Sequence, residues 1–201
     1  MKKITAISLG LLFSAPLLFA QTTTWNIDPV HSRVEISVRH MLIAEVTGRF
    51  TDFGGSLVHT KEDFTDSKIE VVIKAKSINT DNEQRDNHLS SPDFLDAENY
   101  SDITFKSTAV EKTGNNTYRI SGDLTIRGVT NPVVLDANYF GQVKDPYGNV
   151  RAGFKATASI DRFDYGVRWN QLLETGGLIV GETVNITLNV EFIKQVKSGL
   201  E

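Results

Sequence analysis

The stretch VNITLNVEF, residues 184–192, alternates without interruption between apolar and polar residues. This alternation places all of its apolar side chains on one face of a β-strand and all of its polar side chains on the other. The same two-residue period recurs in the segments 33–39, 68–76, 102–106, 118–127, 133–140 and 154–161, and less regularly in 46–58. The sequence therefore predicts about eight strands, each with one face in water and one face in a core.

Turn-forming residues separate these segments. TGNN at 113–116 and DPYGN at 145–149 predict hairpin connections, and GVTNP at 128–132 predicts a tight link between adjacent strands. One polar segment, 79–100, breaks the alternation. Thr80 or Asp81 is suited to cap a helix there, and SPD further on allows a second short helix. We expect a short helical excursion between two strands.

The charges on the polar faces decide which way the sheet is turned. One chain can bury the dry face of such a sheet in a two-sheet sandwich or in a closed barrel. The polar face carries Lys68, Glu70, Lys74, Arg119, Asp123 and Lys155. These charges disfavour a membrane barrel, which is apolar outside and polar in its lumen. The sequence predicts an all-β antiparallel barrel that is apolar inside. A barrel of about eight strands is wide enough to hold one small ligand.

Residues 1–20 have the features of a secretory signal peptide. Lys2 and Lys3 precede a mostly apolar stretch, and Ala20 offers a cleavage site. We expect cleavage near Ala20, export to the bacterial periplasm, and one domain formed by residues 21–201. No later segment approaches the ~20 apolar residues of a membrane-spanning helix.

Net charge and cysteine content exclude two further classes of protein. The formal net charge is −4 and becomes more negative when Lys2 and Lys3 leave with the signal peptide, which argues against nucleic acid as a partner. The chain has no cysteine, so stability must come from sheet closure and burial rather than from disulfides.

A series of short motifs follows the strands in order. They are WxIDxxHS from Trp25, VRHM at 38–41, VxGxF at 46–50, SIxT at 77–80, RDxHL at 85–89, DF at 93–94, ITFxS at 103–107, GDLTIRGVT at 122–130, DRxDYG at 161–166 and GxxV at 181–184. In this order they resemble the YceI-like family of periplasmic lipid- and polyisoprenoid-binding proteins, over essentially the whole chain after the signal peptide. The resemblance implies a lipocalin-like barrel around an elongated apolar cavity. It also implies a bound isoprenoid chain, such as a polyprenyl phosphate or a quinone, or another long-chain amphiphile.

Strand parity selects the residues expected to line the lumen. They are Val34, Ile36, Val38, His40, Val71, Ile73, Phe105, Leu124, Phe154, Ala156, Ala158, Ile186, Leu188 and Val190. Small inward residues (Ala75, Gly122, Ala156 and Ala158) leave room for a ligand. The alternative is a solid core, which is the commoner environment of an inward aromatic residue. For His40 the alternatives are a buried histidine bonded to a neighbour, a strand that already turns at this position, and a polar contact for a ligand head group.

Six residues are candidates for contact with the head group of a lipid: His31, Arg85, His88, Arg162, Trp169 and Asn170. Arg85 and His88 lie in the helical excursion, where a cap over the barrel mouth is expected. Arginine suits bidentate contact with a phosphate, whereas a neutral quinone or fatty amide needs only His, Asn or Ser. A purely structural role is the alternative for Arg162.

The sequence offers little for catalysis or metal binding. Asp28, His31 and Ser32 have the residue types of a hydrolase triad, but groups so close along one extended strand do not easily converge. The four histidines lack ligand spacing. We therefore predict no catalytic residue, no metal site and no cofactor other than a bound lipid.

Three functions remain open at this point. The first is a periplasmic binding or carrier protein for an isoprenoid or other long-chain lipid. The second is a hydrolase or isomerase that acts on such a lipid. The third is a ligand-free interaction or stress module with a solid core. Each leaves room for a homodimer that forms through loops or flat outer faces.

Overall fold

The computed structural model describes residues 21–172 and 177–196, so the expected signal peptide lies outside the described residues. The described chain forms eleven strands, one α-helix and two short 3-10 helices. The strands are β1 (Thr23–Ile27), β2 (Arg33–His40), β3 (Ala44–Phe50), β4 (Phe53–His59), β5 (Lys68–Lys74), β6 (Ile78–Asn79), β7 (Asp102–Lys112), β8 (Thr117–Ile126), β9 (Val129–Lys144), β10 (Val150–Asp161) and β11 (Val180–Lys194). The helix α1 is Glu83–Ser90, and the 3-10 helices are Ala75–Ser77 and Arg162–Tyr165. The predicted all-β class is confirmed.

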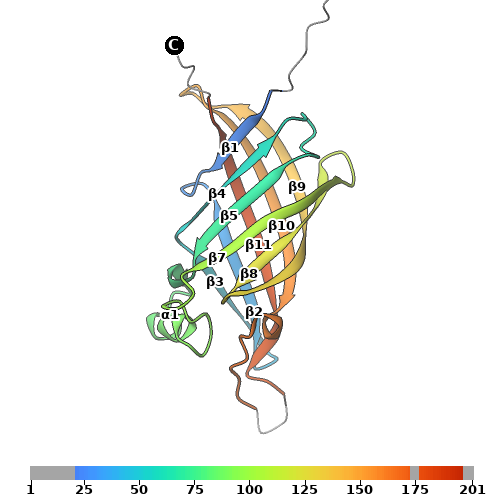
Figure 1. Ribbon diagram of the computed structural model, residues 1–201. Coiled ribbons are helices and arrows are strands. Elements are labelled where there is room, and N and C mark those ends of the chain that lie inside the picture. The colour runs from blue at the N-terminus through green and yellow to red at the C-terminus, as the bar shows by residue number, and fades with distance from the viewer. Residues whose placement is uncertain (1–20, 173–176, 197–201) are drawn as a thin grey trace, which may run out of the picture.

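Eight of these strands form a closed ring in the order β1-β4-β5-β7-β8-β9-β10-β11 (Figure 1). The ring closes because β11 pairs with β1, with Phe192 opposite Ile27. Every pairing is antiparallel, which confirms the lipocalin-like antiparallel barrel of about eight strands. The total is higher than eight because the sheet also continues from β11 through β2 and β3 to the two-residue β6.

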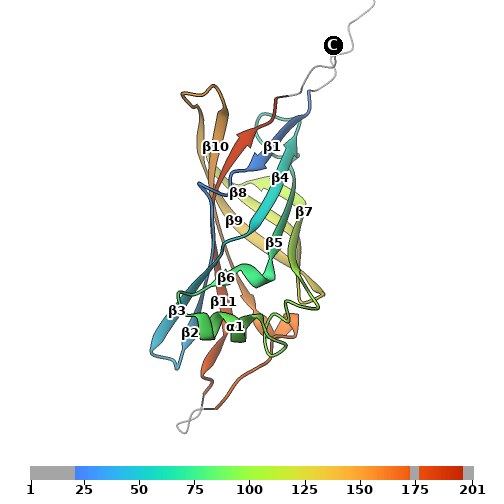
Figure 2. The ribbon, with the colours of Figure 1, turned by 90° about the vertical axis from the view of Figure 1, so that its left-hand side faces the viewer.

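The predicted excursion 79–100 lies within the segment 75–101, which connects β5 to β7. After β5 the chain crosses to β3, where Ile78 pairs with Phe50, and then forms α1 before it returns to the ring at β7. Figure 2 shows α1 across the lower part of the barrel, at the end away from β1. The N-capping residue of helix α1 is Asn82 rather than the predicted Thr80 or Asp81. The Asn82 side chain accepts a hydrogen bond from the Arg85 N–H. Residues 91–93 form turns, so the prediction of a second helix was wrong.

Two local irregularities explain where the period-two pattern is weak. Arg127 and Gly128 both have positive φ (50° and 73°) and form a two-residue hairpin turn, so the link is shorter than the predicted 128–132. In β9, Tyr139 lies opposite Phe154 and Gly141 lies opposite Gly153, which leaves Phe140 between them as a bulge. Phe140 therefore points outward and is 70% exposed.

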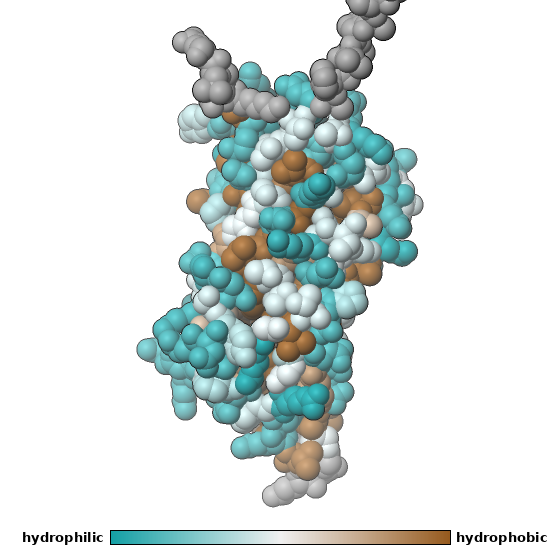
Figure 3. Space-filling view, viewed as in Figure 1, coloured by the Kyte–Doolittle hydropathy of each residue, from teal (hydrophilic) through white to brown (hydrophobic). Residues whose placement is uncertain are grey.

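The outer face is largely polar, as the charge parity predicted. In Figure 3 hydrophilic and neutral side chains cover most of the visible face, with separate apolar groups between them. The core lies inside the ring, where residues of β1, β4, β7, β8, β9, β10 and β11 are buried. Within residues 21–172 and 177–196, no helix is long and apolar enough to cross a membrane.

Candidate binding cavity

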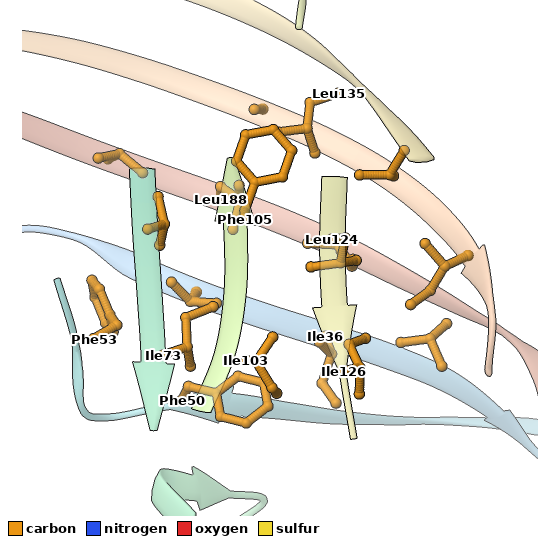
Figure 4. Close-up of a pocket in the computed structure, with 18 of the residues that line it drawn as sticks. Ile36, Phe50, Phe53, Ile73, Ile103, Phe105, Leu124, Ile126, Leu135 and Leu188 are labelled. Atoms are coloured by element: carbon orange, nitrogen blue, oxygen red, sulfur yellow. The ribbon is translucent and has the colours of Figure 1, made fainter. Parts of the chain in front are cut away.

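The barrel contains a cavity of about 250 Å3. One buried water needs only ~10–15 Å3, so the interior is hollow and the solid-core alternative does not hold. Apolar side chains from strands on all sides of the ring form the wall, and Figure 4 shows several of them around the space. Polar groups in the described wall belong to Ser67, Tyr118, Arg162 and Tyr165.

Most of the predicted lumen residues do line this cavity. The structure places Val34, Ile36, Val38, Val71, Ile73, Phe105, Leu124, Phe154, Ala156, Ile186, Leu188 and Val190 in its wall. It leaves His40 and Ala158 outside. His40 is the last residue of β2, opposite Ala44 beside the hairpin turn, so strand parity no longer controls its environment. Ala158 is partly buried against the core but does not border the cavity.

Small inward residues do not account for the cavity, contrary to the expectation from the sequence. Of the small residues expected to leave space, only Ala156 lies in the wall. A side chain at Gly122 would clash with the ring of Phe105, so that ring already occupies the space beside the glycine. Ala75 is buried in the core. The cavity therefore follows from the width of an eight-stranded ring rather than from small residues.

Several wall residues come from segments without any strand pattern. Phe64 lies in the connection between β4 and β5, and Leu89, Phe94 and Leu95 lie in the excursion 75–101. The one sequence signal that could have indicated these four wall residues is that they are apolar residues in otherwise polar connections. Phe64 lies at one end of the cavity, and Leu89, Phe94 and Leu95 lie at the other.

An aromatic plug closes the end of the barrel near β1; we define it as Trp25, His59, Phe64, Tyr139 and Phe154. The Phe64 ring lies 4.6 Å from His59, 5.3 Å from Tyr139 and 5.6 Å from Phe154, measured between ring centroids. Trp25 Nε1 donates to His59 Nε2 at 2.9 Å. His59 Nε2 is therefore an acceptor, and Nδ1 carries the proton that it donates to the Lys61 carbonyl at 2.7 Å.

The connection 60–67, which we call the strap, holds Phe64 in the plug. Phe64 has φ +61°, a left-handed conformation that is rare for a bulky residue. Asp66 fixes the strap because its carboxylate accepts hydrogen bonds from the Thr60 hydroxyl and from the N–H groups of Thr60 (3.0 Å) and Lys61 (3.1 Å). These bonds, led by the Thr60 hydroxyl, lower the pKa of Asp66 to about 2.

A different group of rings covers the opposite end; we call the elements there the cap and define it as the excursion 75–101 together with residues 162–172 and 177–180. The ring of His88 lies 5.0 Å from Phe94 and 5.0 Å from Trp169, and Phe94 lies 5.2 Å from Trp169. His88 Nε2 also faces Asp93 Oδ2 at 3.0 Å. Phe94 connects this group to the cavity, since it also lies in the cavity wall.

A family model described as the YceI-like domain matches residues 25–192. The chain belongs to the YceI-like family. It is 36% identical over 171 residues to the UPF0312 protein SA2479 of Staphylococcus aureus, and this alignment covers 85% of this chain and 97% of the relative. The solved Campylobacter jejuni YceI protein matches with TM-score 0.65 and 31% identity, over 79% of this chain and 90% of that one. A polyisoprenoid binding domain from Saccharophagus degradans gives TM-score 0.63 at 14% identity, over 85% and 98%, and so shares the fold.

In this YceI-like protein the cap contains five of the six head-group candidates, namely Arg85, His88, Arg162, Trp169 and Asn170. Arg162 is 5% exposed, and burial lowers its pKa. Its guanidinium donates to four backbone carbonyls: Val167 at 2.7 Å, Gly181 at 2.8 Å, Trp169 at 2.9 Å and Val180 at 3.0 Å. Four of its five N–H groups are therefore engaged, which favours the structural role for Arg162.

Two more polar candidates, Asn170 and Arg85, are also bonded within the protein. Asn170 Nδ2 donates to the Val180 carbonyl at 2.6 Å. Arg85, on the same helix as His88, donates from Nε to the Thr80 hydroxyl and from Nη2 to the Thr80 carbonyl, both at 2.8 Å. Neither Asn170 nor Arg85 lies in the cavity wall.

His31 lies apart from the cap, in a charged cluster formed by the turn after β1 and by residues of β10 and β11. His31 Nδ1 is 2.8 Å from Asp28 Oδ2, and Arg151 Nη1 is 2.7 Å from the same oxygen and contacts Glu191. The bonds from His31 and Arg151 lower the pKa of Asp28 to about 2. Ligand atoms of Asp28, His31 and Glu191 lie within 4.8 Å of one another, but the Arg151 guanidinium already supplies the positive charge there.

The hydrolase triad is not assembled in the structure. The Ser32 hydroxyl accepts a hydrogen bond from the Glu191 N–H at 3.0 Å and donates to the Glu191 carbonyl, and Ser32 is 1% exposed. Its hydroxyl therefore satisfies the backbone of β11 rather than approaching the imidazole of His31.

Proposed function

We propose that this protein binds an isoprenoid or other long-chain lipid in the barrel cavity and carries it in the periplasm. The apolar cavity is the observation that carries the proposal. Burial of an apolar chain contributes about 25 cal/mol per Å2, so a long tail can bind tightly through the wall alone. A lumen closed by a plug and a cap also keeps the tail out of water.

Two further observations support this function. The Saccharophagus degradans domain with the same fold is named as polyisoprenoid binding. The first twenty residues have the charge and apolar pattern of a signal peptide, which supports export. A carrier needs both a protected cavity and access to the compartment between the membranes.

The same geometry favours binding over catalysis. Hydrolysis or isomerisation in the lumen needs a nucleophile or base beside the ligand. His31 and Asp28 bond each other in the charged cluster with Arg151, and His40 lies outside the cavity wall. We therefore propose a carrier rather than an enzyme.

A variant pair tests whether the lumen is the binding site. Ala156 lies in the cavity wall, and its neighbour Thr157 on β10 faces out and is exposed. In Ala156→Trp the indole fills the cavity, and we expect binding of geranylgeraniol to fall by at least tenfold. In Thr157→Trp, the matched control, affinity stays at the wild-type value. Equal affinity in both variants would exclude the lumen as the site, and no binding in wild type would exclude this function.

A further inference from the structure

In the part of the chain that the structure describes, one buried side-chain polar atom has no hydrogen-bond partner: the Oγ of Ser67. Ser67 is 7% exposed and lies in the cavity wall, at the last position of the strap. We propose that Ser67 is the contact for an uncharged oxygen group of the ligand, such as a hydroxyl, a carbonyl or an amide. The oxygen-bearing end of the lipid then lies deep at the plug, and its tail points toward the cap. This inference rests on the proposed function.

The surroundings of Ser67 leave its hydroxyl available. The Ser67 N–H donates to the Phe64 carbonyl at 3.1 Å, so its backbone is committed to the strap. Ser107, whose hydroxyl contacts the backbone of Ser67, accepts from the Ile69 N–H at 2.8 Å and donates to the Ser67 carbonyl at 3.4 Å. A buried hydroxyl without a partner is destabilising, and a serine side chain can turn between staggered rotamers to meet a ligand.

The charges around the cavity indicate an uncharged ligand group. Arg162 is the one charged residue in the described wall; it belongs to the cap, and its guanidinium is bound to backbone carbonyls. Burial, with a smaller contribution from Asp63, raises the pKa of Tyr118 at the plug end. A phosphate beside Ser67 would be desolvated without a counter-charge, whereas a neutral oxygen needs only one hydrogen bond.

The strap holds the backbone of Ser67 in place before a ligand binds. Phe64 holds a left-handed backbone conformation, and strain of this kind persists where the surrounding structure constrains it. Asp66 supplies that constraint through its bonds to Thr60 and Lys61. A preorganised contact adds affinity because little further ordering is needed on binding.

Probes with one tail and different ends test the proposal. We would measure the affinity of the delipidated protein without its signal peptide for phytanol, for phytanyl phosphate and for phytane, which share the same saturated, branched tail. One buried hydrogen bond corresponds to about a tenfold gain in affinity. The alcohol is expected to bind about tenfold more tightly than phytane, and more tightly than the phosphate.

Three variants locate that gain. Ser67→Ala removes the advantage of the alcohol and leaves phytane unchanged, whereas Ser67→Thr keeps the hydroxyl and the advantage. Ser159→Ala, an exposed serine on β10, is the matched control and changes neither affinity. An alcohol advantage that persists in Ser67→Ala, or tightest binding of the phosphate, overturns the proposal. If phytane and the alcohol bind equally, only this inference fails; if no probe binds, the proposed function fails with it.

A photoreactive alcohol tests the orientation independently. The probe is geranylgeraniol with a diazirine beside its hydroxyl, cross-linked in the wild-type protein and mapped by peptide mass spectrometry. Labelling of residues 59–67 is the expected result. Labelling confined to residues 83–95 of the cap would place the oxygen at the other end and overturn the proposal.

Discussion

The two ends of the barrel are closed by different physical means. At the plug, rings carried by β4, β9 and β10 pack around Phe64 inside the ring of strands. At the cap, α1 has no buried residue, and the loop after β10 is held by hydrogen bonds from Arg162 to backbone carbonyls. Elements with little buried apolar surface open at lower free energy than packed cores. Helix α1 is therefore expected to open more readily than the plug, whereas Phe94 and Ala97, which are buried, stabilise the rest of the excursion.

The two tryptophans of the chain report on these ends separately. Trp25 lies in the plug and Trp169 lies in the cap, and the sequence contains no other tryptophan. Variants with a single tryptophan, Trp169→Phe and Trp25→Phe, therefore give the fluorescence of one end at a time.

The largest effect is expected for Phe64→Ala at the plug. Removing a buried phenyl ring costs about 4 kcal/mol of unfolding free energy through lost contacts and the space left behind. Phe140→Ala, at the 70% exposed bulge of β9, is the matched control and should change stability by less than about 0.5 kcal/mol. Urea unfolding measures both. Equal losses would show that the plug is not a packed core.

Arg162→Leu should destabilise by about 3 kcal/mol, because it leaves buried carbonyls without donors. The loss should be local to the cap: Trp169 emission moves to longer wavelength, Trp25 emission stays constant, and ligand release accelerates. The exposed Arg168→Leu serves as the control. A shift at Trp25 instead would contradict the separation of the two ends.

The hairpin between β2 and β3 is strained and contacts the cap side. Met41 and Leu42 have φ of 51° and 65°, and the Met41 N–H donates to the Ile179 carbonyl at 2.8 Å. Bulky residues are unfavourable in this conformation, whereas asparagine and glycine adopt it readily. The double substitution Met41→Asn with Leu42→Gly should therefore stabilise the protein by about 1 kcal/mol. Thermal unfolding checks this, and a loss of stability would contradict the strain.

Acid should weaken the plug through Asp66. Its pKa is about 2 in the folded state against an ordinary 3.8, so the unfolded chain binds the proton more readily. The stabilisation is therefore present above pH ~4–5 and is lost as the pH falls toward 2. Because Asp66 is partly exposed, we expect only about 0.5 kcal/mol. Asp66→Asn should remove that part of the pH dependence of unfolding; an unchanged pH profile would contradict the role of the strap.

Strand parity explains why the wall of the cavity was predictable. A strand has only two faces, so one clear alternation such as 184–192 assigns Ile186, Leu188 and Val190 together. Parity gave the wrong prediction for His40, because the strand ends in a turn there. It also did not distinguish Ala156, which lies in the cavity wall, from Ala158, which packs against the core. Parity decides which face a residue takes, but it does not locate a cavity along the barrel.

The ends of the cavity were not predictable in the same way. Phe64 and Phe94 come from connections that have no period, and their contacts join segments distant in the sequence. The sequence identified Arg162 as a head-group candidate. The carbonyls that it bonds belong to Val167, Trp169, Val180 and Gly181, and these contacts form only in the folded structure. Ser67 carried no local signal, since its significance lies in the partner that it lacks.

The most direct test of the lipid-carrier function is mass spectrometry of organic extracts from the purified wild-type protein, Ala156→Trp and Thr157→Trp. We expect an isoprenoid or other long-chain lipid in about equimolar amount from wild type and from Thr157→Trp, and its loss from Ala156→Trp. Extracts free of such a lipid from all three proteins, or the same lipid retained by Ala156→Trp, would contradict a carrier that holds its ligand in the barrel.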